Sequence, residues 1–122
     1  MAGGAGGMTT EGGDMVKLVS EKLIRIIAAA ELEAQLVELS KRRSVSGYTV
    51  VDARGAGASG IQPGLMDIDS NILFLMVVPP EQFDEVMEDL AKIMRRGHHM
   101  MVLVSDTEVM RRKNVSVDKP GV

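Results

Sequence analysis

A run of seven consecutive apolar residues constrains the fold of this chain more than any other feature. The run "ILFLMVV" covers residues 72–78 and stands between Asn71 and a pair of prolines. Neighbouring side chains of a β-strand point to opposite faces of the sheet, so a strand of this kind is apolar on both faces. "MMVLV" at 100–104 repeats the pattern. We therefore expect a sheet that is covered on both sides.

The clearest helix follows directly. "PPEQFDEVMEDLAKIMRRG", residues 79–97, carries prolines in its first turn, acidic residues early and arginines late, and it ends at a glycine. This arrangement is typical of a helix whose termini match the helix dipole. The predicted buried face comprises Phe83, Val86, Met87, Leu90 and Met94.

The remaining elements complete a recognisable order. Leu32, Leu36 and Leu39 recur at helical spacing and predict a helix over 30–43. The predicted strands cover residues 22–29, 44–53, 71–78 and 98–105. The order is βαββαβ, which predicts an α+β, ferredoxin-like fold. Two helices cover one face of such a sheet, so we predict that a further subunit covers the other face.

Composition limits the class of protein. Residues 15–114 are predicted to form a single domain, preceded by a disordered tail or cloning remnant at 1–14 and followed by a flexible segment at 115–122. The net charge is −3 and aromatic residues make up 2%, which argues against nucleic-acid binding. There is no cysteine. No segment has the length of a membrane span or the pattern of an export signal, so a cytoplasmic location without membrane insertion is expected.

The glycines at 55, 57 and 60 have the G-x-G-x-x-G spacing of a dinucleotide-binding turn. Such a turn needs a helix directly after its glycines. Here "IQPGLMDIDS" follows, with Pro63, Gly64 and no helical period, so we exclude that site. Two interpretations remain open. The loop wraps an anion with its backbone N–H groups, or it is a flexible loop without a ligand.

Other polar groups give weaker signals. His98 and His99 are neighbours on a predicted strand and point to opposite faces, so no metal site is predicted. No catalytic set of residues is recognisable, and we do not predict an enzyme. Arg95 and Arg96 are interpreted either as a helix C-terminus favoured by the dipole or as a phosphate ligand.

These patterns together resemble the PII signalling proteins. The similarity rests on the βαββαβ order, on "GYTVVDARGAG" leading into a long glycine-rich insertion between the second and third strands, and on "VVPPEQ". The insertion resembles the family's T-loop. "GYTVVD", "DIDSN" and the short connection after the second helix are more similar to PII-like regulators of inorganic-carbon uptake. That group includes the carboxysome-associated PII protein and the partner of the sodium–bicarbonate transporter.

The resemblance implies a homotrimer that binds adenine nucleotides in clefts between subunits. By motif position, Thr49 lies beside the adenine and Val77 lines the base pocket, while Gly55 and Gly57 offer backbone N–H groups to the phosphates. "VMRRKN" contributes the basic phosphate contacts. The implied nucleotide-binding residues are Thr49, Arg54, Gly55, Gly57, Val77, Arg111 and Lys113.

Departures from the family pattern shape the expected ligands. The family's loop glutamine falls at Ser59, the phosphate loop after the second helix is reduced to "RRGHH", and the loop has no tyrosine. The resemblance therefore implies ADP or AMP in preference to ATP, no uridylylation and no tightly bound cofactor. Bicarbonate is the expected second ligand, with Arg54 and Ser59 as donors.

The implied function is regulation of inorganic-carbon uptake or of the carboxysome. Residues 54–69 would then dock on a bicarbonate transporter or a carboxysome-related partner. A slow nucleotide hydrolase, or a metal-binding trimer of the same fold, stays open as an alternative.

Overall fold

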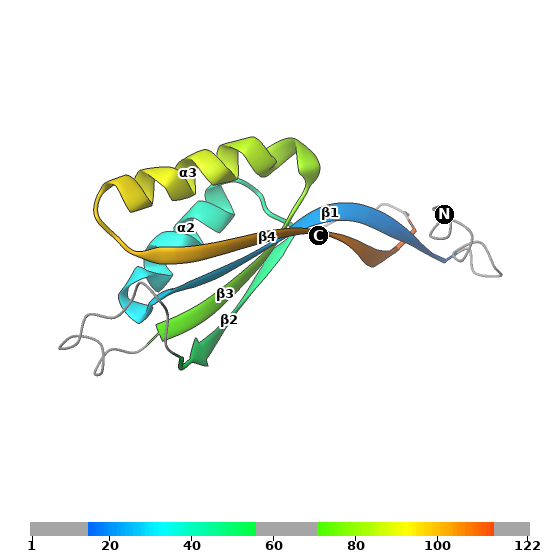
Figure 1. Ribbon diagram of the computed structural model, residues 1–122. Helices are drawn as coiled ribbons and strands as arrows, with labels where there is room; N and C mark the ends of the chain where they lie inside the picture. Colours follow the sequence, from blue (N-terminus) through cyan, green and yellow to red (C-terminus); the bar gives the residue numbers. More distant parts are fainter. Residues whose placement is uncertain (1–14, 56–70, 114–122) are drawn as a thin grey trace. The chain divides into compact units, whose positions relative to one another are not determined.

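The computed structural model describes residues 15–55 and 71–113. In chain order the elements are β1 (Val16–Ala29), the 3-10 helix η1 (Ala30–Leu32), α2 (Glu33–Arg42), β2 (Gly47–Ala53), β3 (Asn71–Val78), the 3-10 helix η3 (Pro80–Gln82), α3 (Phe83–Arg95) and β4 (Met100–Arg112). The four antiparallel strands form one sheet in the order β2-β3-β1-β4 (Figure 1). The predicted α+β fold with its βαββαβ order is confirmed.

The chain divides into two compact units. The larger unit, Lys22–Asp106, contains both helices and the hydrophobic core. The described part of the smaller unit comprises residues 15–21 and 107–113, which belong to the outer ends of β1 and β4. There the backbone N–H of Lys113 donates to the carbonyl oxygen of Met15 at 2.7 Å.

Two strands are longer than the sequence predicted. We expected the first strand to begin at residue 22 and the fourth to end at residue 105, whereas β1 begins at Val16 and β4 ends at Arg112. The apolar runs end where the prediction stopped. The added residues mix polar and apolar side chains without a clear pattern. They form strands because their backbones pair with each other, and the hydropathy of the sequence does not indicate that pairing.

The core lies between the sheet and the two helices, which cover the same face (Figure 1). Along β3, residues alternate strictly between buried and half-buried. Phe74, Met76 and Val78 are fully buried beneath the helices. The further core residues are Ile24, Ile26, Ala28, Leu32, Leu36, Leu39, Ile72, Val86, Leu90 and Ile93.

The helices match the predicted amphipathic pattern with one correction. The three leucines of the first helical segment are buried, as predicted. On α3, however, Met94 is 45% exposed, and Ile93 takes the core position instead. The two residues are neighbours in sequence and both are apolar, so the packing of the helix on the sheet, and not hydropathy, distinguishes them. Gly97 adopts φ +102° and ends the helix, as its placement predicted.

Opposite charges join the two helices. The carboxylate of Asp89 on α3 is buried and accepts hydrogen bonds from Arg43 at 2.7 and 3.2 Å and from Arg42 at 3.3 Å. The hydrogen bond from Arg43 lowers the pKa of Asp89 below its ordinary value, against the opposing effect of burial, and Arg42 adds to the lowering. The basic C-terminal end of α2 is thereby fixed to the middle of α3.

In the described part of the chain, no helix lies on the opposite face of the sheet (Figure 1). Ile27 on β1 is 39% exposed, Val51 on β2 is 44% exposed, and Met101 and Leu103 on β4 are 45% and 43% exposed. Among residues 15–55 and 71–113, the helices therefore cover one face of the sheet only. Among the described residues, no helix is long and apolar enough to cross a membrane.

Candidate functional site

The pairing of β2 with β3 brings two of the predicted ligand-binding residues together. Thr49 lies opposite Leu75, and Gly47 lies opposite Val77. Strand alternation puts these residues on the uncovered face, because Phe74 and its alternate neighbours point into the core. Thr49 and Val77 are therefore near neighbours on the same face of the sheet, on adjacent strands. Thr49 is exposed and Val77 is half-buried.

Gly47, the cross-strand partner of Val77, leaves the backbone next to these two side chains accessible. A Cβ atom built on Gly47 meets nothing within 4 Å, so the space on its side of the strand is open. A hydroxyl, an apolar side chain and uncovered backbone thus meet at this end of β2. These groups suit a flat, partly apolar ring that needs a few hydrogen bonds for orientation.

The base of the glycine-rich insertion follows the other end of β2. Arg54 and Gly55 come directly after Ala53, and both are exposed. A Cβ atom on Gly55 also meets nothing within 4 Å, so the described part of the chain does not itself demand a glycine there. Gly57 and Ser59 lie outside the described residues, as does the rest of the predicted docking segment.

Arg111 and Lys113, the two basic residues of "VMRRKN" that the resemblance implies as phosphate contacts, belong to the smaller unit. Arg111 contacts the carboxylate of Glu21, with both Nε and Nη2 at 3.2 Å from Oε2. The carboxylate side chain is only 6% exposed, whereas that of Arg111 is 38% exposed. Lys113 is exposed. Arg111 is thus an anion-binding side chain that already holds one anionic group.

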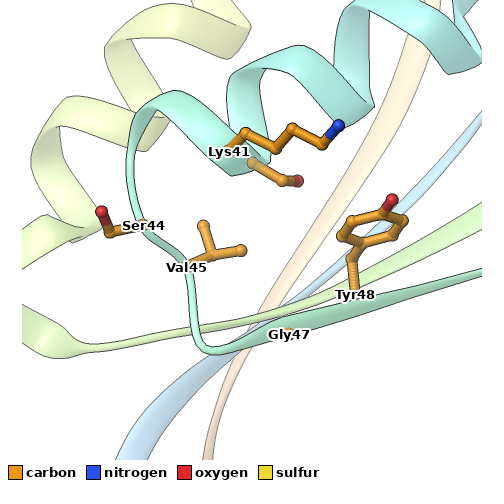
Figure 2. Close-up of a pocket in the computed structure, with 6 residues that line it drawn as sticks. Lys41, Ser44, Val45, Gly47 and Tyr48 are labelled. Carbon is orange, nitrogen blue, oxygen red and sulfur yellow. The ribbon is translucent and has the colours of Figure 1, made fainter. Parts of the chain in front are cut away.

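A shallow pocket of about 280 Å³ lies where α2 turns into β2 (Figure 2). Tyr48 forms one wall, and its ring stacks on Phe74 with centroids 5.2 Å apart and planes 10° apart. The lining residues are Ser40, Lys41, Ser44, Val45, Gly47 and Tyr48. None of these six was a predicted site residue. The one sequence feature that could have indicated this pocket is Tyr48, the single tyrosine of the chain, which directly precedes Thr49.

The arginines at the end of α3 have partners within the same chain. Arg95 donates to Glu88 at 3.0 Å, and Arg96 donates to Gln35 at 2.9 Å. These contacts favour a structural role for both arginines at the C-terminal end of α3 over a role as phosphate ligands. Within residues 15–55 and 71–113, no group of three metal-ligating side chains is found.

Comparison with known proteins now identifies the family. The family model "Nitrogen regulatory protein P-II" matches residues 21–114, which include all the described elements except the first residues of β1. This chain belongs to the P-II family. The predicted PII-like resemblance is thereby confirmed, and the PII-like proteins are signalling proteins.

Solved structures of PII-like proteins have the same fold. A PII-like signalling protein from Thermus thermophilus is 32% identical, with a TM-score of 0.61, and the match covers 75% of this chain and 91% of that one. CPII from Thiomonas intermedia, bound to ADP, AMP and bicarbonate, is 30% identical, with a TM-score of 0.65. That match covers 76% of this chain and 91% of CPII. No curated protein matches the chain.

A second CPII structure extends the ligand comparison. CPII bound to ADP and bicarbonate is 29% identical, with a TM-score of 0.64 and the same coverage of both chains. Adenine nucleotides and bicarbonate are therefore ligands of a PII-like protein that this chain matches over most of its length. The individual contact residues of this P-II chain stay predictions.

Proposed function

We propose that this PII-like protein is a regulator that binds ADP or AMP together with bicarbonate. The observation that carries the proposal is the match to CPII, whose structures hold ADP, AMP and bicarbonate and which this chain matches over 91% of the CPII length. We further propose that the binding state controls inorganic-carbon uptake or carboxysome function. The target would be a bicarbonate transporter or a carboxysome-related protein.

The proposed assembly is a homotrimer joined through the uncovered face of the sheet. Proteins of the PII family are typically trimers. Support from this chain comes from the apolar side chains that the helices leave exposed, among them Ile27, Val51 and Leu103. Burying such a surface against a second copy removes apolar area from water at about 25 cal/mol per Å².

The proposed contacts for the base are on β2 and β3. Thr49 donates or accepts a hydrogen bond with the adenine edge, and Val77 packs against the ring. Support comes from the register that makes the two residues near neighbours, and from the open space beside Gly47. A threonine hydroxyl and an exposed backbone give orientation, and the valine gives apolar contact.

The proposed phosphate and bicarbonate contacts are charged or glycine residues. Gly55 and Gly57 offer backbone N–H groups to the phosphates, and Arg111 and Lys113 offer cationic side chains. Arg54 and Ser59 are the proposed donors to bicarbonate. The exposure of Arg54 and the open space at Gly55 support an approach by an anion at the end of β2.

Calorimetric titration with AMP, ADP and ATP, each with and without bicarbonate, tests the proposal. We expect ADP and AMP to bind and bicarbonate to change their affinity. Charge-assisted hydrogen bonds from an arginine are worth about 1.5–3 kcal/mol. Arg111→Ala should therefore weaken ADP binding about ten- to a hundredfold. Wild-type protein that binds no adenine nucleotide would contradict the proposal.

Amide hydrogen exchange of residues 54–69 tests the proposed link to a partner. A ligand shifts a conformational ensemble only by its differential affinity for the states. If nucleotide and bicarbonate prepare this segment for docking, protection of its amides should rise in their presence. Equal protection without ligand, with ADP, and with ADP plus bicarbonate would exclude a switch in this segment.

A further inference from the structure

Glu21 differs from most of the described acidic side chains because it is buried. Its residue exposure is 6%, and among the described acidic residues only Asp89 is comparable, at 5%. Asp89 has an evident structural role, since two arginines of the α2 end hold it between the helices. Glu21 instead lies against Arg111, which the proposed function makes a phosphate ligand.

The contact uses one edge of the guanidinium group. Nε and Nη2 of Arg111 both lie 3.2 Å from the same oxygen, Oε2 of Glu21. A guanidinium carries five N–H donors in one plane. The donors of Nη1, on the far edge, therefore point away from the carboxylate. The Arg111 side chain is 38% exposed, in contrast to the buried Glu21 carboxylate, so it is the member of the pair that is open to a ligand.

A phosphate bound there meets an arginine whose charge is already balanced. The N–H donors on the edge of the guanidinium away from Glu21 still give the directional hydrogen bonds that suit one phosphate group. The carboxylate behind them repels every further negative charge on the ligand. Hydrogen bonding to the first phosphate is thus retained, while attraction for additional phosphates is cancelled.

We propose that Glu21 determines nucleotide specificity by charge, and that it disfavours ATP relative to ADP and AMP. The inference rests on the proposed function, in which the nucleotide phosphates bind at Arg111. The preference for ADP and AMP was expected from departures from the family pattern such as the shortened "RRGHH" connection. The inference assigns part of it to the ion pair between Glu21 and Arg111.

The expected size of the effect follows from the repulsion between unit charges. At a separation of roughly 8 Å, and with an effective dielectric constant between those of water and the protein interior, one added charge changes Kd by about three- to sixfold. Removing the Glu21 charge should therefore increase the affinity for all three nucleotides, most for ATP, less for ADP and least for AMP. The gain for ATP should exceed the gain for AMP by about tenfold or more.

The test is a calorimetric titration of wild type and Glu21→Gln with AMP, ADP and ATP, without magnesium and at low salt. Glu108→Gln is the matched control, because Glu108 is an exposed glutamate of the same compact unit and the net charge changes equally. We expect a graded gain in affinity for Glu21→Gln and less than about a twofold change for Glu108→Gln. Raising the salt concentration should reduce the gradation, because salt screens charges that are partly exposed.

A purely structural role for Glu21 gives a different result. If the carboxylate only held Arg111 in place, Glu21→Gln would weaken all three nucleotides by a similar factor. A uniform change, or no change, overturns the inference.

Thermal melts report whether the variant folds, and Glu21→Met supplies a second uncharged side chain that suits a buried position. If wild type binds no adenine nucleotide, the proposed function fails. If wild type binds ADP and the gradation is flat, only the role of Glu21 fails.

Discussion

The two faces of the sheet are built from similar residues and have different surroundings. Along β3, Phe74 and Met76 are fully buried under the helices, while Leu73 and Leu75 on the opposite face are half-buried. All four are large and apolar. The comparison shows that hydropathy alone does not separate a residue that stabilises the single chain from one that is available for assembly.

The reason is the number of helices. α2 and α3 have ten and thirteen residues, and both lie on the same face (Figure 1). Within residues 15–55 and 71–113, there is no third α-helix to cover the second face. We therefore expect substitutions on the covered face to act on folding and those on the other face to act on assembly and ligand binding.

The largest effect is expected from Phe74→Ala. This ring is fully buried and stacks on Tyr48, so truncation removes a large apolar contact and leaves a cavity. The free energy of unfolding should fall by about 3–5 kcal/mol. Urea unfolding followed by circular dichroism, at a fixed protein concentration, measures the change. A loss below about 1 kcal/mol would show that the covered face does not carry the stability.

Leu73→Glu tests the opposite face at the same strand. Leu73 lies opposite Ile27 of β1 and Val51 of β2, so a carboxylate there has apolar neighbours on both sides. In a subunit interface an unpaired charge costs about 3 kcal/mol or more. Multi-angle light scattering should therefore show dissociation to monomers with helical content unchanged. If wild type itself were monomeric at micromolar concentration, the proposed assembly would be wrong.

Asp89→Asn tests the ion pairs that hold the helices on the covered face. The variant should lose about 1–3 kcal/mol of stability at neutral pH, because Arg43 and Arg42 lose a buried carboxylate partner. The pKa of Asp89 is lowered in the folded protein, so its contribution is fully present above the ordinary value of 3.8. That contribution is lost as the pH falls through the lowered folded value.

Thermal melts of wild type and Asp89→Asn across an acid pH series measure that dependence. The difference in stability between the two proteins should be constant from neutral pH down to about pH 5 and should shrink below about pH 4. A difference that grows toward low pH would contradict the assigned direction of the pKa shift.

The smallest effect is expected from Thr49→Val. The substitution keeps the shape of an exposed side chain on the uncovered face and removes one hydroxyl. Loss of a neutral hydrogen bond to the adenine should weaken ADP binding about three- to tenfold, with little change in melting temperature. Thr107→Val is a control at a half-buried threonine of the smaller unit. Equal affinities for wild type and Thr49→Val would remove Thr49 from the site.

The elements were predictable from sequence where a strong local pattern exists. The leucines of the first helical segment and the proline start and glycine end of α3 are local signals, and they gave the right elements. The outer ends of β1 and β4 were missed, because pairing between distant segments determines them. The choice of Ile93 over Met94 for the core likewise depends on how α3 packs on the sheet.

The proposed contact residues come from family resemblance and stay predictions, because no local sequence pattern indicates them. Thr49 and Val77 are unremarkable in sequence, and it is the β2–β3 register that makes them near neighbours. The contact between Glu21 and Arg111 joins residues separated by 90 positions, so no local pattern indicates it. The tyrosine-lined pocket at the α2–β2 turn also depends on tertiary packing, through the stacking of Tyr48 on Phe74.

The sequence by itself determined the order of the elements and the apolar character of the sheet. Side-chain periodicity and helix-end chemistry act over a few residues, and a linear sequence carries that information directly. Only the tertiary structure decided which apolar face the helices cover and which anionic group lies against Arg111. Both depend on contacts between distant segments, whose free energy is gained only when the whole fold brings those segments together.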